Sequence, residues 1–172
     1  YDLRIFTSVR KMYELIMQFS EEEENKNSRI VATFDWDYSQ AHGTGEGEKE
    51  PWLVSVPEEN WSLPWNDEHA ARDVYYQKKY KKDNHLPWIE QKYSIDEVGS
   101  TFSVQGFDMS YVGVILGPSI SYDEDNDCVK IVPENCHDKK ASSTRTYEDG
   151  AKANFTEILV WNAVNILLTR GR

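Results

Sequence analysis

The fold is predicted outward from one stretch of the sequence, Thr101–Pro118 (TFSVQGFDMSYVGVILGP). The run Tyr111–Leu116 is almost continuously apolar, which is typical of a strand inside a parallel sheet. A polar turn containing Gln105, Gly106 and Asp108 comes immediately before that run. The stretch therefore predicts a buried strand that is entered from a polar turn.

Strands and helices alternate in the rest of the chain. Arg29–Phe34 and Asp96–Ser103 have the composition of two further strands, whereas helical periodicity begins at Ser8. The final helix begins at Asn154 or Thr156, and its apolar residues nearly surround it, which predicts deep packing. This alternation predicts an α/β fold in which helices flank a mainly parallel sheet.

Two shorter features complete the predicted fold. The segments Ser119–Tyr122 and Val129–Val132 flank an acidic turn and predict an inserted β-hairpin, and Leu3–Phe6 predicts a short strand. The whole of residues 1–172 fits a single domain. Because the chain starts without a methionine, we expect it to be a fragment of a longer protein.

The charge of the chain limits how it can bind nucleic acid. A formal net charge of −11 argues against a module that binds phosphates on its own, but it allows one face of a shared channel. The strongest positive cluster lies on a predicted helix, Glu68–Lys82, so Lys78 and Lys79 are the candidate phosphate contacts. Trp36 is either a base-stacking platform or, alternatively, a packed core aromatic.

The sequence contains neither a targeting segment nor a metal motif. No apolar run is long enough to cross a membrane, and the amino end lacks the pattern of a signal peptide. Cys128 and Cys136 lack further ligands at metal-binding spacing, so we expect two free thiols and no metal site. These features predict a cytoplasmic location.

The glycine-rich segment Gln40–Pro51 is not a phosphate-binding loop. A Walker A motif needs Gly-Lys-Ser/Thr, whereas Lys49 lies between Glu48 and Glu50. The glutamates of this segment would repel a phosphate. The chain therefore has no Walker A lysine, and we do not expect it to hydrolyse ATP by itself.

Two stretches resemble motifs of superfamily-one helicases. Val98–Pro118, with its Gln-Gly-Phe-Asp turn before an apolar strand, resembles motif V, and Asn162–Gly171, NAVNILLTRG, resembles motif VI. Together with the loop Phe34-Asp35-Trp36, their order is similar to the carboxyl-terminal half of an uncharacterised bacterial family of P-loop ATPases. That family is related to Schlafen-type helicase domains.

The resemblance implies that residues 1–172 form the second RecA-like domain of a helicase or translocase. In such proteins ATP and Mg²⁺ lie between two RecA-like domains, and the upstream domain holds them through Walker A and Walker B. The resemblance makes Arg170 the arginine finger. It also implies that the upstream domain is a partner of this one. Four residues would bind the nucleotide: Gln105, Gly106, Asp108 and Thr169. Two residues would contact DNA or RNA through their hydroxyls: Thr101 and Ser103.

The residues also allow other interpretations. Arg170 could be a surface arginine, because a cation is favoured at a helix C-terminus, and Asp108 could serve only its own turn. The protein could then be a non-catalytic RecA-like module that binds nucleic acid or protein. A third hypothesis is a metal-dependent nuclease that uses Asp35, Asp37 and the acidic cluster at Asp123.

Overall fold

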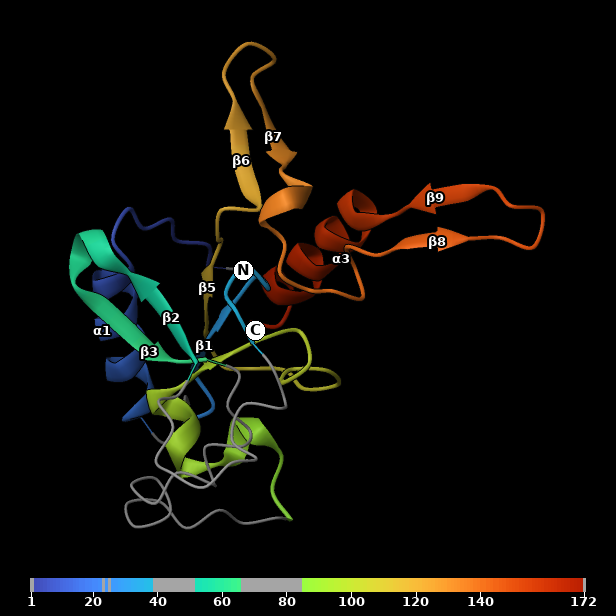
Figure 1. The fold of residues 1–172 in the computed structure, drawn as a ribbon. Helices are drawn as coiled ribbons and strands as arrows, with labels where there is room; N and C mark the ends of the chain where they lie inside the picture. The colour runs from blue at the N-terminus through green and yellow to red at the C-terminus, as the bar shows by residue number, and fades with distance from the viewer. Residues whose placement is uncertain (1, 23, 25, 39–51, 66–84, 172) are drawn as a thin grey trace, which may run out of the picture.

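A computed structural model describes residues 2–22, 24, 26–38, 52–65 and 85–171 (Figure 1). The predicted helix that carries Lys78 and Lys79 lies outside these ranges. In chain order the helices and strands are α1 (Val9–Ser20), β1 (Arg29–Ala32), β2 (Leu53–Val56), β3 (Trp61–Pro64), β4 (Val98–Gly99), β5 (Val112–Ile115), β6 (Ile120–Asp123), β7 (Cys128–Ile131), β8 (Thr144–Thr146), β9 (Lys152–Asn154) and α3 (Thr156–Leu168). Short 3-10 helices cover Pro57–Glu59, Trp88–Glu90, Lys92–Asp96 and Pro133–Asn135.

The centre of the fold is a parallel sheet with the strand order β4-β1-β5. Every residue of β1 is buried, which suits its position between two neighbours. The prediction of an α/β protein with a parallel sheet is confirmed, whereas these three strands do not by themselves define a RecA-like fold. The run Tyr111–Leu116 does contain a strand, but β5 lies at an edge of the described sheet rather than in its interior.

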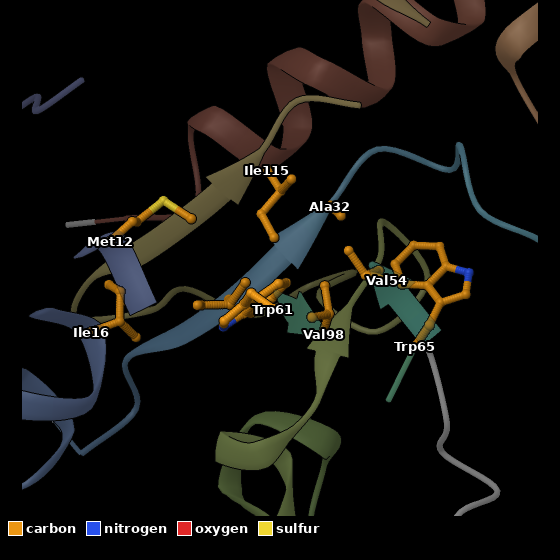
Figure 2. Close-up of a cluster of buried hydrophobic side chains, with 9 residues drawn as sticks. Met12, Ile16, Ala32, Val54, Trp61, Trp65, Val98 and Ile115 are labelled. Carbon is orange, nitrogen blue, oxygen red and sulfur yellow. The ribbon is translucent and has the colours of Figure 1, made fainter. Parts of the chain in front are cut away.

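Helix α1 covers one face of this sheet. Ser8 caps the helix by accepting a hydrogen bond from the Lys11 N–H, as its position before the periodic stretch indicated. Met12 and Ile16 pack with Trp61 and the sheet in one buried cluster (Figure 2). Gly113 permits this close packing, because a Cβ there would lie 3.1 Å from Ile16 and 3.3 Å from the Met12 sulfur.

The opposite face of the sheet packs against a second cluster. Alternate strand residues point to opposite faces, so Val31 faces away from α1 and joins a cluster that includes Met109 and Leu167. Beside it, the buried guanidinium of Arg29 donates to Ser94 Oγ and to the Gln91 carbonyl. Burial lowers the pKa of Arg29 to about 10, and these bonds fix the 3-10 segments against β1.

Helix α3 is less deeply packed than its sequence predicted. Val160, Val164 and Leu167 are buried, but Ile158 is 59% exposed and Ile166 is 37% exposed. The helix lies beside the sheet (Figure 1), and its buried residues, Thr156, Val160, Val164 and Leu167, form a single stripe. An all-round apolar sequence therefore leaves an apolar face uncovered in the described structure.

Three antiparallel hairpins surround the sheet. The β6–β7 pair confirms the predicted β-hairpin. Both β6–β7 and β8–β9 project from the body of the protein (Figure 1). The polar segment that forms β8 gave no strand signal, and the Trp-rich segment forms β2–β3. The prediction for Leu3–Phe6 is wrong, because this segment is exposed and irregular. Both thiols are free as expected: Cys128 is exposed at the start of β7, and Cys136 is buried.

Candidate functional site

The turn before β5 and the end of α3 meet in space. The Met109 N–H donates to the Arg170 carbonyl oxygen at 2.7 Å, and Met109 also forms a parallel bridge with Gly171. Met109 is completely buried, so this contact is anchored in the second cluster. The fold thus places the two helicase-like motifs, which are far apart in the sequence, side by side.

The side chains of Arg170 and Asp108 face each other at this junction. Arg170 Nη1 lies 3.8 Å from Asp108 Oδ1, a loose ion pair whose side chains are 27% and 55% exposed, respectively. Arg170 Nε is buried and has no hydrogen-bond partner among the described residues. Because a pair this exposed contributes at most about 1 kcal/mol, the guanidinium can exchange Asp108 for a stronger anionic partner.

The backbone of the polar turn at residues 104–108 is held in place by its own hydrogen bond and by the buried Val104. Gly106 has a φ of +85°, a conformation that L side chains rarely adopt. The Phe107 N–H donates to the carbonyl of Val104, and Val104 is completely buried. Gln105, Gly106 and Asp108 are all exposed on this anchored turn, where an incoming ligand can reach them.

Other predicted hydroxyl groups are already engaged within the protein. The Ser103 hydroxyl accepts a hydrogen bond from the Ser100 N–H, and Ser103 is only 6% exposed. The Thr169 hydroxyl donates to the Asn165 carbonyl oxygen at 2.7 Å, which ties it to the last turn of α3. Thr101 is half-buried in the same turn region as Ser103.

Trp36 packs against the first buried cluster. It is half-buried against the first cluster, where it packs edge-on against Trp65. Its indole N–H lies 3.4 Å from the Ser55 carbonyl oxygen, to which it donates. These contacts favour the alternative in which Trp36 is a packed aromatic.

A second polar cluster, at the carboxyl end of β1, is missing from the sequence-based predictions. Asp35 Oδ2 accepts from the Thr33 hydroxyl at 3.1 Å and from the Ser119 N–H at 2.7 Å. The Thr33 hydroxyl in turn accepts from the Gly117 N–H. Burial raises the pKa of Asp35, and the hydrogen bonds from Ser119 and Thr33 partly offset this rise. The cluster, which we call the Asp35 clamp, fixes the chain between β5 and β6 to the end of β1.

The carboxylates proposed for a nuclease do not form a metal site. Asp37 pairs with His137 at 2.7 Å, and Asp123 accepts two backbone N–H groups in the β6–β7 turn. Within the described residues, no three His, Cys, Asp or Glu side chains are placed to hold a metal ion. The nuclease hypothesis therefore gains no support from the structure.

These observations define an α/β domain in which Arg170, at the end of α3, faces Asp108 in the polar turn before β5. Residues 1–172 match the family described as "Schlafen group 3, DNA/RNA helicase domain". The chain belongs to that family, whose description names a DNA/RNA helicase domain.

One curated relative is an uncharacterised protein of the yeast Saccharomyces cerevisiae. It is 32% identical to this chain over 171 residues, which are 99% of this chain and 33% of the relative. The chain thus spans about a third of that relative's length. No solved structure matches the chain. The expected relation to Schlafen-type helicases is confirmed, whereas the bacterial origin that the resemblance implied gains no support.

No helix in the described part of the chain is both long and apolar enough to cross a membrane.

Proposed function

We propose that this chain is the second RecA-like domain of a helicase-type ATPase and that Arg170 is its arginine finger. In this proposal ATP and Mg²⁺ are held mainly by a preceding domain of the same protein, and DNA or RNA is the polymer on which the ATPase acts. The supporting observation is the position of Arg170, held through its backbone by Met109 and paired only loosely with Asp108.

The chemistry of this arrangement suits a finger. An arginine stays charged at neutral pH and can donate two hydrogen bonds to one phosphate group. The Arg170 side chain is partly exposed and its Nη1 contacts Asp108 only loosely, so its terminal N–H groups remain available as donors for a γ-phosphate. Charge shifts between the phosphates in the transition state, so such a donor stabilises the transition state more than it stabilises bound ATP.

The other residues of the junction take supporting roles. Asp108 lies beside Arg170 and is exposed. Its carboxylate can therefore accept a hydrogen bond from a ribose hydroxyl once Arg170 has moved to the nucleotide. The exposed turn at Gln105 and Gly106 would connect the nucleotide to the nucleic-acid groove. Thr169 acts indirectly, because its hydroxyl is engaged by Asn165 and orders the helix end that carries Arg170.

The proposal is tested on the full-length protein. Steady-state ATP hydrolysis is measured with and without single-stranded DNA or RNA for the wild type, Arg170→Ala and Arg170→Lys. We expect both variants to lose roughly 10³-fold in kcat, the lower end of the effect of an arginine finger. The KM for ATP should change much less, because the preceding domain provides most of the ground-state binding.

Arg145→Ala is the matched control, since Arg145 is an exposed arginine on β8. Its kcat should equal that of the wild type. An unchanged kcat in Arg170→Ala would remove the finger assignment while leaving an ATPase. A wild-type protein that binds nucleic acid without hydrolysing ATP would instead support the non-catalytic module.

A further inference from the structure

The β8–β9 hairpin concentrates positive charge in a chain whose formal net charge is −11. Four of the seven lysines and arginines within residues 85–171 lie at positions 139–152: Lys139, Lys140, Arg145 and Lys152. The β6–β7 hairpin has the opposite character, because four acids lie within Asp123–Asp127. Both hairpins project from the body of the protein (Figure 1). A polyanion that is repelled by β6–β7 can therefore approach β8–β9.

The cations of β8–β9 are not paired with nearby carboxylates. Asp138 Oδ1 accepts from two backbone N–H groups of its own turn. The hairpin turn contains Glu148 and Asp149, and Asp149 Oδ1 accepts from the backbone N–H two residues further on. Within the described ranges, none of the four cations forms an ion pair, whereas Lys130 on β7 has Asp123 at 3.7 Å. The cations of β8–β9 thus retain their donors for an external anion.

The register of the hairpin collects side-chain donors on one face. Residues directly opposite each other in an antiparallel pair share a face, and successive residues alternate between faces. The register places four exposed residues on the same face: Thr144, Thr146, Lys152 and Asn154. Each of them carries a hydrogen-bond donor, so we call this surface the donor face. Arg145 lies on the opposite face of the hairpin.

The donor face is fixed to the start of α3. Asn154 Oδ1 accepts from the Thr156 N–H at 2.8 Å, which leaves the amide N–H groups of Asn154 as donors. Thr156 is buried, and its hydroxyl lies 3.1 Å from the carbonyl oxygen of Ala141, in the chain that enters β8. Both strands of the hairpin are thus connected to the helix. Donors on a fixed base lose little conformational freedom when they bind a ligand.

We propose that the donor face binds the phosphodiester backbone of a single strand of DNA or RNA. Lysine, threonine and asparagine side chains all contact phosphate oxygens in nucleic-acid complexes, and these are the three residue types of the donor face. Lys152 supplies a charge-assisted hydrogen bond, and the neutral donors beside it position the backbone. The choice of a nucleic acid as the polyanion rests on the proposed function.

This surface lies away from the turn that contains Gln105 and Gly106. The hairpin joins the start of α3, whereas Arg170 follows its end and meets that turn through Met109. The 13 residues of α3 span roughly 20 Å at about 1.5 Å per residue. The donor face is therefore a second contact with the strand, at the opposite end of the helix from the nucleotide.

Fluorescence anisotropy of a dye-labelled single strand, titrated with the full-length protein in the absence of ATP, tests this contact. We expect Lys152→Ala to weaken binding about tenfold, as for the loss of one hydrogen bond to a charged group. The slope of log K against log salt should fall in magnitude by about one. Lys152→Arg retains the charge and should retain most of the affinity.

Arg145→Ala is the matched control, because it removes the same charge from the opposite face of the same hairpin. It should change the affinity by no more than about twofold, since a charge without a direct contact is screened by salt. Equal losses in Arg145→Ala and Lys152→Ala would show attraction to charge alone, and an unchanged affinity in Lys152→Ala would show that no contact exists. Either result would overturn the donor face, whatever Arg170→Ala does to ATP hydrolysis.

Three probes identify the chemistry that the donor face recognises: DNA and RNA strands of the same sequence, and polyglutamate. Lys152→Ala should weaken binding to DNA and RNA equally, because the phosphodiester is common to both. A loss confined to RNA would assign the contact to the 2′-hydroxyl, and an equal loss with polyglutamate would show a surface for acidic polypeptides. Both of these results contradict the proposal. A wild type that binds neither strand would remove the donor face and the nucleic acid of the proposed function together.

Discussion

The backbone N–H of Met109 and the carbonyl oxygen of Arg170 are joined by a hydrogen bond of 2.7 Å. This bond connects the polar turn before β5 directly to Arg170 at the end of α3. Because Met109 is fully buried, the relative position of the two motifs depends on core packing as well as on their own residues.

Truncating Met109 should therefore weaken both the fold and the junction. We expect Met109→Ala to lower the free energy of unfolding by about 2–5 kcal/mol, as for other buried methionines. Urea denaturation measures this loss. Met17→Ala is the control, because Met17 is only half-buried on α1, and it should cost clearly less. Equal losses would mean that the Met109 site collapses around the smaller side chain.

Adding a methyl group at Gly113 should separate α1 from the sheet. An alanine Cβ there would lie 3.1–3.3 Å from Ile16, Ile30 and Met12, and overpacking of this kind costs about 1–3 kcal/mol. Thermal or urea unfolding of Gly113→Ala measures the cost. Combining it with Ile16→Ala should cost less than the sum of the two single changes, since the cavity accepts the added methyl group. Strict additivity would contradict the predicted clash.

The Asp35 clamp should make stability depend on pH. Burial raises the folded-state pKa of Asp35 above its ordinary value of 3.8, so folding favours the protonated acid. This contribution is fully present below about pH 4 and is lost as pH rises through the raised folded pKa. Asp35→Asn retains an acceptor without the charge, so its stability relative to the wild type should increase over that window.

Asp35→Ala separates the charge from the hydrogen bonds. It leaves the Ser119 N–H and the Thr33 hydroxyl without their acceptor, so we expect a loss of about 1–3 kcal/mol. That loss should remain at neutral pH, where Asp35→Asn is at least as stable as the wild type. Urea titrations between pH 4 and pH 8 measure both variants, and parallel curves for wild type and Asp35→Asn would argue against a raised pKa.

Glu59 should produce the opposite dependence on pH. Its carboxylate accepts hydrogen bonds from the Ser8 hydroxyl and from the Val9 and Arg10 N–H groups at the start of α1. These bonds, that of Ser8 first, lower the pKa of Glu59 below its ordinary value of 4.5. The stabilisation is present above that value and disappears as pH falls through the folded pKa.

The prediction for Glu59 is measured as a melting temperature. We expect Glu59→Gln to melt below the wild type at pH 7, with the difference shrinking as pH falls from 5 to 3. Glu58→Gln is the matched control, since Glu58 is an exposed neighbour in the same short helix. A Glu58 variant that loses as much as the Glu59 variant would assign the effect to general charge rather than to the helix cap.

The sequence predicted features that depend on neighbouring residues. Three of them carry a local signal: the apolar period from Ser8, the apolar run before Gly117, and the acidic turn between β6 and β7. The β8–β9 hairpin lacks such a signal, because its strand residues are mostly polar and exposed. The partial exposure of α3 was also missed, since composition cannot show how much of a helix its neighbours cover.

For the candidate site, resemblance was more informative than residue pattern. The motif order paired the turn at Asp108 with Arg170, and the fold places them together. The Asp35 clamp and the Glu59 cap were missed, because each joins residues from distant parts of the chain. Asp35 meets Ser119, and Glu59 meets the helix start at Val9. A single sequence gives no signal for such long-range hydrogen bonds.

The position of Cys128 makes this domain easy to label at one site. The chain has only two cysteines; Cys128 is exposed on the projecting β6–β7 hairpin, whereas Cys136 is buried, and its burial raises the thiol pKa. Because the thiolate is the reactive form, a maleimide dye should attach to Cys128 first. The hairpin would then carry a fluorescent reporter of nucleic-acid approach without any engineered cysteine in this domain.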